Sequence, residues 1–211
     1  MGDFFKGEKL MQRKMFDVLA SVGGLLIVVA LLVAGGLLTY GYNFTTSSVS
    51  SQLARQAITF PSKAAFANAK AGTEITPAMI PYLAQYAGMP LTTGAQAQAY
   101  ADHFIAVHLS QMPYGGVYSK VSAASRANPS NTALAAEVQT SFQGTTLRGL
   151  LLEAYAFSEF GLIAFWAAVA SFVLAGLMAL LVALGLWHAR RTPLDKELAI
   201  HVEAERVLVS G

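Results

Sequence analysis

The amino-acid sequence predicts an all-α membrane protein in which two transmembrane helices flank a small helical extracytoplasmic bundle. Residues 18–40 and 161–186 contain no charged side chain. As helices rising about 1.5 Å per residue, both stretches can cross a hydrocarbon core about 30 Å thick. Composition agrees, because 55% of the 211 residues are hydrophobic and 12% are charged, whereas about a quarter are charged in soluble domains.

The first transmembrane helix is predicted over residues 17–42, after a cytoplasmic N-terminus of residues 1–16. Four basic residues precede the apolar stretch: Lys6, Lys9, Arg13 and Lys14. Because this stretch is longer than a signal-peptide core of about 7–15 residues and ends without an A-x-A-like cleavage site, it indicates an uncleaved signal anchor. Lys and Arg collect on cytoplasmic flanks, so these bases place the N-terminus inside.

The second transmembrane helix is predicted over residues 160–188, followed by a cytoplasmic tail of residues 189–211. Basic residues follow its apolar stretch: His188, Arg190, Arg191 and Lys196. They place the C-terminus on the cytoplasmic side, the side predicted for the N-terminus. The chain is therefore expected in the plasma membrane with both termini cytoplasmic and residues 43–159 outside. In the tail, Thr192 and Pro193 are typical of a helix start, and a short amphipathic helix is expected there.

Small residues recur at every fourth position of the second span: Ala167, Ser171, Ala175, Ala179 and Ala183. Such stripes allow helix backbones to approach closely. The stripe predicts a helix interface, and two partners fit it: the first span of the same chain, or another subunit. Neither span contains an ionisable residue of the kind that marks an ion path, which argues against a channel or pump made from this chain alone.

The extracytoplasmic domain is expected to contain four or five short helices. A Ser/Thr-rich connector starts at Asn43, and a short extended stretch is expected over residues 57–60. Thr76 and Pro77 are typical of a cap followed by proline, and this helix is expected to end before Gly88, with Pro81 as an alternative start.

The second half of the domain has clearer helix boundaries. Thr93 and Gln96 predict a capping box for an amphipathic helix that ends at Met112. Its buried face is expected to hold Ala97, Ala101, Phe104, Val107 or His108, and Met112. A helix over residues 117–128 follows, and Ser130 or Asn131 caps the next one. Gly144 is expected to interrupt that helix, and Thr145 or Thr146 to open a last helix that continues into the second span.

The sequence predicts no catalytic residue. His103 and His108 are five positions apart, which places the imidazoles on different faces of a helix, so neither a metal site nor a cofactor is predicted. The chain has no Cys and none of the common phosphate-binding or hydrolase motifs. The net charge of +2 does not indicate nucleic-acid binding, and no enzyme activity is predicted.

Arg148 is the only base at the start of the predicted last helix. It is expected to cap the carboxyl end of the preceding helix, whose carbonyls near residues 141–144 lack partners. The alternative is that Arg148 docks an anionic ligand or partner.

Three stretches carry a resemblance to known proteins: LTTGAQAQAYADHFIAVHL, YSKVSAASRANPSN and SFQGTTLRGLLLEAYAF. Followed directly by an apolar span, they resemble a group of actinobacterial two-span integral membrane proteins that keep similar blocks in this order. The resemblance covers roughly residues 16–188. It implies a plasma membrane protein with a helical extracytoplasmic domain and no established activity, and it assigns no functional residue.

These features predict a noncatalytic accessory or scaffolding subunit of a plasma membrane assembly. Its expected partners are the lipid bilayer and a membrane protein or a second copy of the chain. The alternative is an extracytoplasmic ligand-binding or sensor module that works through a separate transducer. A polar pocket in the external domain would favour the alternative, and an exposed apolar or aromatic surface would favour the subunit.

Overall fold

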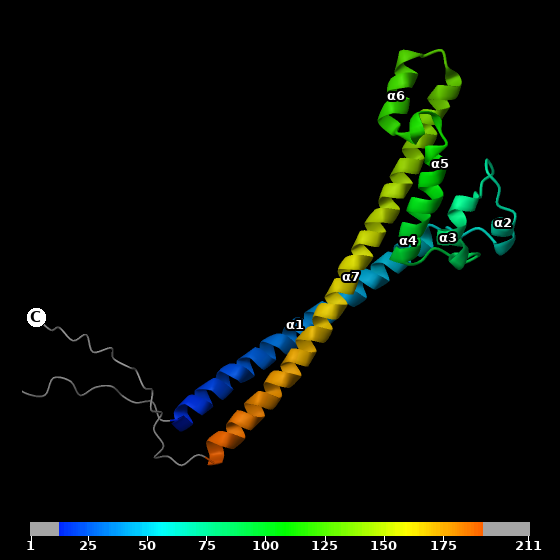
Figure 1. Ribbon diagram of the computed structural model, residues 1–211. Helices are drawn as coiled ribbons and strands as arrows, with labels where there is room; N and C mark the ends of the chain where they lie inside the picture. The colour runs from blue at the N-terminus through cyan, green and yellow to red at the C-terminus, as the bar shows by residue number, and fades with distance from the viewer. Residues whose placement is uncertain (1–12, 192–211) are drawn as a thin grey trace, which may run out of the picture. The chain divides into compact units, whose positions relative to one another are not determined.

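The structure is a computed structural model that describes residues 13–191. Within this range the chain forms helices joined by turns and contains no strand, which confirms the predicted all-α class (Figure 1). An isolated bridge pairs Thr59 with Pro90 and makes residues 58–60 extended, as predicted, whereas Ala57, the first residue of the predicted stretch, lies in a turn with φ 53°. Lys6, Lys9 and the predicted tail helix lie outside the described residues.

Two long helices dominate the chain: α1 (Arg13–Arg55) and α7 (Thr132–Arg191). Both extend well beyond the apolar stretches, so the predicted connector from Asn43 is wrong. Its Ser and Thr residues are compatible with a helix because their hydroxyls donate to carbonyls one turn back. Thr45 Oγ1 lies 3.0 Å from the Gly41 carbonyl oxygen, and Ser51 Oγ lies 3.1 Å from that of Ser48.

The predicted break at Gly144 is also wrong, because α7 continues through it. Asn131 caps this helix, as its Oδ1 accepts a hydrogen bond from the Leu134 amide at 3.0 Å. Gly144 instead allows a close approach, since a Cβ atom at this position would lie 2.7 Å from Leu109 Cδ2. The glycine therefore marks a packing contact of the helix and not its end.

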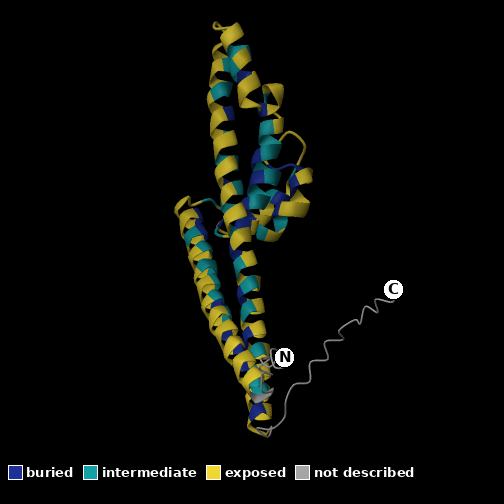
Figure 2. Cartoon of the chain, turned by 90° about the vertical axis from the view of Figure 1, so that its left-hand side faces the viewer, coloured by how far each residue is buried: buried dark blue, intermediate teal, exposed yellow. Residues whose placement is uncertain are grey.

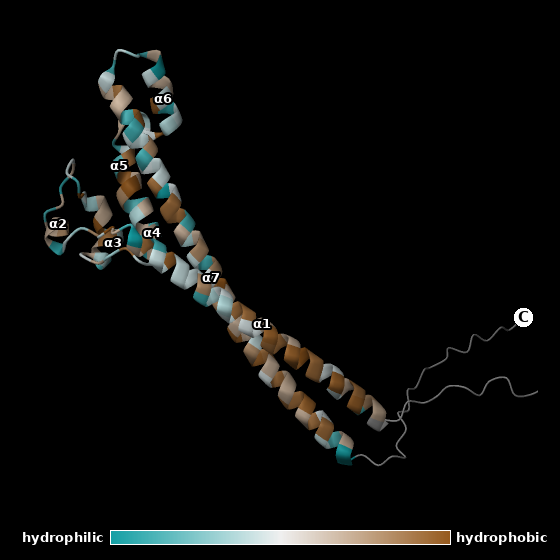
Figure 3. Cartoon of the chain, turned by 180° about the vertical axis from the view of Figure 1, so that it is seen from behind, coloured by the Kyte–Doolittle hydropathy of each residue, from teal (hydrophilic) through white to brown (hydrophobic). Residues whose placement is uncertain are grey.

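The chain divides into two compact units, to which α1 and α7 both contribute. The helix-pair unit holds the residues up to Leu37 and those from Ala167 onward, and the middle unit is Leu38–Trp166. In the helix-pair unit, apolar residues cover both helices along their length (Figure 3). Most of them are exposed (Figure 2).

The two helices of the helix-pair unit run antiparallel and contact each other through small residues. A Cβ atom on Gly24 would lie 2.6 Å from Val182 Cγ2, and one on Gly185 would lie 3.0 Å from Ser21 Oγ. On α1 the buried positions are Ser21, Gly24, Val28 and Gly35. On α7 they are Ala168, Ala175 and Ala189. These spacings of three, four, seven and fourteen residues follow a heptad repeat, the pattern of left-handed helix pairs.

The middle unit contains shorter helices between α1 and α7. They are α2 (Lys63–Ala67), η1 (Pro77–Met79), α3 (Ile80–Leu83), η2 (Ala84–Tyr86), α4 (Gly94–Tyr100), η3 (Ala101–Ile105), α5 (Ala106–Ser110), η4 (Pro113–Gly116) and α6 (Tyr118–Ala127). Their core is lined by Val49, Leu53, Phe60, Phe66, Ile75, Met79, Leu83, Leu91, Ala97, Ala101, Ile105 and Leu151. Among the described residues, this is where large apolar side chains are buried most completely.

The capping box predicted at Thr93 is confirmed, with the Gln96 amide 3.3 Å from Thr93 Oγ1 and the Thr93 amide 3.0 Å from Gln96 Oε1. Thr76 is the N-cap residue of η1 and Pro77 follows it, as predicted, but the Thr76 side chain makes no capping hydrogen bond. The helix predicted there is divided into η1, α3 and η2. Pro77 and Pro81 each remove an amide donor, which accounts for these short pieces.

The helix from Gly94 to Ser110 contains a π-helical segment, η3. The wider turn changes which residues face the core: Ile105 is buried together with Ala97 and Ala101, whereas Phe104 and Met112 are half-buried. The predicted face is therefore confirmed in part: Phe104 and Val107 are only partly buried but still pack against the core, and the fully buried Ile105 was not predicted.

The rod of α4, η3 and α5 lies along α7 in the middle unit (Figure 1). It runs antiparallel to α7, because Gly94 contacts Ser158 at one end and Leu109 contacts Gly144 at the other. An ion pair between Asp102 and Arg148 lies between these two contacts.

Candidate functional site

The predicted small-residue stripe on α7 divides into buried and exposed positions. Ala175 is 2% exposed and packs in the helix-pair unit. Ala167 and Ser171 are half-buried, whereas Ala179 and Ala183 are exposed. A four-residue repeat advances about 40° around a helix at every step, so it cannot follow a straight contact line. The buried line instead contains Ala168 and Ala189.

Arg148 does not cap a helix, because α7 continues through the position where the cap was predicted. Its guanidinium donates from Nη2 to Asp102 Oδ1 at 2.7 Å. Asp102 belongs to η3, so the pair links the π-helical segment to α7. Both side chains are about one-third exposed (39% and 33%), and ion pairs in such surroundings contribute only about 0.2–1 kcal/mol.

The two histidines of the middle unit lie in separate aromatic contacts. His103 stacks face to face on Tyr82, with the ring centroids 3.5 Å apart. His108 Nδ1 lies 2.8 Å from the Phe104 carbonyl oxygen, which fixes its proton on Nδ1. Among the described residues, no group of three His, Asp or Glu side chains is placed to hold a metal ion.

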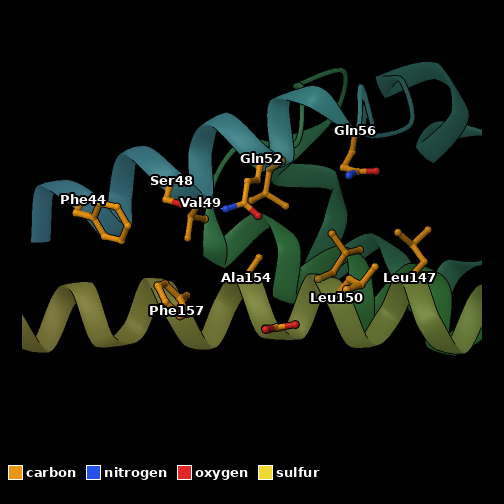
Figure 4. A pocket seen from close by; sticks show the side chains of 12 residues that line it. Phe44, Ser48, Val49, Gln52, Gln56, Leu147, Leu150, Ala154 and Phe157 are labelled. Carbon is orange, nitrogen blue, oxygen red and sulfur yellow. Dashed lines mark hydrogen bonds between the residues drawn. The ribbon is translucent and has the colours of Figure 1, made fainter. Parts of the chain in front are cut away.

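An apolar groove lies between α1 and α7 within the middle unit, and it was not predicted from the sequence (Figure 4). Its volume is about 320 Å³. Val49, Leu53 and Leu151 form the floor and belong to the hydrophobic core. The remaining lining residues are Phe44, Ser48, Gln52, Gln56, Leu147, Leu150, Glu153, Ala154 and Phe157.

The two sides of the groove differ in polarity. The α1 side presents Ser48 and Gln52, whose side chains hydrogen-bond to each other at 2.8 Å, and Gln56 follows one turn later. The α7 side is apolar except for Glu153. No basic residue lines the groove, so it offers hydrocarbon contact and neutral amides but no site for a phosphate.

A second surface of the middle unit is an exposed aromatic patch, which we define as Tyr114, Val117, Tyr118 and Phe142. These side chains are each more than 40% exposed. The rings of Tyr118 and Phe142 are in contact, with centroids 5.6 Å apart. The patch therefore joins η4 and α6 to α7.

The turn below this patch is held in an uncommon conformation. Tyr114 has φ 57° and ψ 25°, in the left-handed region that a non-glycine residue rarely adopts. Gly116 has φ 66°, and its carbonyl accepts a hydrogen bond of 2.6 Å from the fully buried Ser141 hydroxyl. This buried bond fixes the turn to α7 and so fixes the position of the patch.

The sequence contains a partial signal for both surfaces. Ser48 and Gln52 are four positions apart, and Gln56 follows four positions later just after the end of α1; this polar stripe becomes visible once residues 43–55 are treated as helical. Tyr114 and Tyr118 stand on either side of two glycines, which mark the turn. The pairing of Tyr118 with Phe142 could not be predicted, because it depends on how α6 packs on α7.

The described residues define an all-helical protein with two long apolar helices. Comparison of the chain with protein-family models, with curated proteins and with solved structures gave no match.

Proposed function

We propose that the chain is a noncatalytic accessory or scaffolding subunit of a plasma membrane protein assembly. In this proposal α1 and α7 cross the bilayer, both termini are cytoplasmic and the middle unit is outside. The basic residues that flank the apolar stretches support this orientation. The resemblance to actinobacterial two-span membrane proteins supports the same architecture.

The burial of the two long helices supports a membrane location. Only 22% of the most apolar 18-residue stretch of α1 is buried, and 11% of that of α7. A core helix of a soluble protein would be mostly covered by its neighbours, whereas here each helix is covered along one line only. The remaining Leu, Val and Phe side chains need an apolar environment, which a bilayer supplies.

The aromatic patch carries the proposal that the chain binds a protein partner. Aromatic residues are enriched in protein interfaces, where a few of them contribute most of the binding energy. Tyr118 and Phe142 are exposed and in contact, and the turn beside them is anchored by a buried hydrogen bond. A preformed surface of this kind lowers the entropy cost of association.

The proposal is tested by purifying the tagged full-length protein from its native membrane in a mild detergent and identifying what is retained. A stoichiometric partner is expected. Tyr118→Ser combined with Phe142→Ser should reduce its recovery by at least about 10-fold, because loss of an interface hot spot costs about 2 kcal/mol or more. Met89→Ser is the matched control, since Met89 is exposed in the same unit but outside the patch. A protein that elutes alone, or a partner retained by the double variant, would contradict the proposal.

The apolar groove favours a second candidate function, an extracytoplasmic ligand-binding module. Its floor is formed by core residues, and its volume is near the lower end of the about 300–1,000 Å³ typical of ligand pockets. In this second candidate function the module works through a separate transducer.

A further inference from the structure

We propose that the groove of the middle unit binds one acyl chain of a bilayer phospholipid. This inference rests on the membrane placement in the proposed function, and it names the ligand class for the groove. The headgroup stays at the bilayer surface, and a single chain lies between α1 and α7.

The lining of the groove suits a hydrocarbon chain. Val49, Leu53 and Leu151 form a nearly dry floor, and Leu150 and Phe157 are exposed along the α7 side. Apolar surface that is already open to water gains by being covered with hydrocarbon. The hydroxyl of Ser48 is satisfied by Gln52, so this part of the polar side does not require a ligand hydrogen bond.

The dimensions of the groove match one extended chain. The lining positions on the α1 side run from Phe44 to Gln56, about 18 Å at 1.5 Å per residue. One leaflet of a hydrocarbon core about 30 Å thick has acyl chains that cover about 15 Å. A helix about 10–12 Å across and 18 Å long would occupy more than about 1,000 Å³. The groove volume of about 320 Å³ accommodates a chain far better than a helix.

One end of the groove is continuous with an apolar band of the same unit. Phe44 and Phe157 line this end. Tyr40 lies one turn before Phe44, Phe160 lies one turn after Phe157, and both are more than 60% exposed. Aromatic residues at such positions are typical of a membrane interface. A chain can therefore enter the groove from the bilayer without crossing water.

The charges of the groove distinguish a phospholipid chain from a free fatty acid. Glu153 is the one charged residue of the lining, and it is acidic. A fatty acid lying wholly within the groove would bring its carboxylate close to this side chain or leave it in an apolar wall, and both are unfavourable. A phospholipid keeps its charged groups outside and presents only its chain.

The test uses the full-length protein in vesicles of phosphatidylethanolamine and phosphatidylglycerol that contain a phospholipid with a diazirine at the end of one acyl chain. After illumination, labelled residues are identified by tandem mass spectrometry. Labelling is expected at residues 52–56 and 147–151, about 12 Å along α1 from Phe44. Lipid that only surrounds the helices cannot reach this far end of the groove.

Leu150→Glu should reduce labelling at the far end by at least about 10-fold, because it places a charge in the hydrocarbon path. Ala156→Glu is the matched control, since Ala156 is exposed on another face of α7 and does not line the groove. Leu150→Gln makes the same test without a charge if the glutamate variant does not fold.

Three results would overturn the inference: labelling confined to residues 17–42 and 160–188, far-end labelling that Leu150→Glu leaves unchanged, or far-end labelling by a diazirine fatty acid but not by the phospholipid. The partner recovery described above is measured on separate variants and without the probe. Failure of the groove inference therefore leaves the assembly proposal standing, whereas a protein that does not enter vesicles at all contradicts the membrane placement first.

Discussion

Replacement of Gly24 by leucine should separate the two helices of the helix-pair unit, whereas the same replacement at Gly23 should not. A Cβ atom on Gly24 would lie 2.6 Å from Val182 Cγ2, but one on Gly23 would meet nothing within 4 Å apart from its own stretch of α1. The two glycines are neighbours on α1, so they share the same helix and nearly the same position along its axis. Any difference between the two leucine variants therefore reports the effect of packing alone.

The expected magnitude follows from the contact distance. Carbon atoms pack best about 3.5–4.0 Å apart, so the new Cβ is about 1 Å too close before the rest of the leucine is added. Val182 is short and β-branched, and it has few other rotamers to adopt. The helices must therefore move, and overpacking of this kind costs about 1–3 kcal/mol. The change in helix propensity from glycine to leucine is common to both variants and cancels.

The absence of cysteine from the sequence provides a direct assay. Ser21→Cys and Gly185→Cys introduce two thiols at a position where a Cβ on residue 185 lies 3.0 Å from the side chain of residue 21. Their effective concentration, measured by redox titration with glutathione in detergent or vesicles, reports how often the helices are in contact. Gly24→Leu should lower it by about 5–150-fold, the equivalent of 1–3 kcal/mol, and Gly23→Leu should leave it nearly unchanged.

Equal effective concentrations in the two leucine variants would refute this reasoning. They would mean that α1 and α7 do not pack through Gly24, and the heptad repeat of buried residues would lose its significance. A large loss in both variants would show instead that α1 tolerates no bulk on either face.

Two further predictions concern the middle unit. Gly144→Ala should lower the free energy of unfolding by about 1–3 kcal/mol relative to the control variant Gly149→Ala, because the added methyl group meets Leu109 only at position 144. Chemical denaturation measures both variants, and equal stabilities would contradict this packing. Burial raises the pKa of Tyr100, and the negative charge of Glu74 raises it further. The unfolded chain therefore loses this proton first, stability falls as the pH rises above about 10, and Tyr100→Phe should lose less stability over that rise in a pH series of unfolding curves.

The sequence was sufficient to predict the elements whose signals are local. The capping box at Thr93 depends on residues three positions apart, and the cap at Asn131 on the amide of Leu134. Both interactions lie within one helical turn, so they form wherever the rest of the chain is placed. The two apolar stretches are equally local, because their length and lack of charge decide what they can become.

The elements that were predicted wrongly depend on distant contacts. A break was predicted at Gly144 because glycine is common where helices end, but Leu109 packs against this position and the helix continues. Arg148 was expected to cap that break. Its partner is Asp102, 46 positions earlier in the chain, which no periodicity could indicate. The groove and the aromatic patch are tertiary features of the same kind.

For the small-residue stripe of α7, the predicted type of contact residue was right but the predicted periodicity was wrong. Ala175 lies on both the predicted four-residue repeat and the observed heptad repeat, so it is buried in the helix-pair unit, but Ala179 and Ala183 have rotated away from that contact and are exposed. The two interpretations of the stripe therefore apply to different residues. Ala175 belongs to the packing of α7 on α1, while Ala179 and Ala183 are exposed and take no part in that contact. A leucine at Ala175 would test the fold of the helix pair, and a leucine at Ala179 would test only what surrounds it.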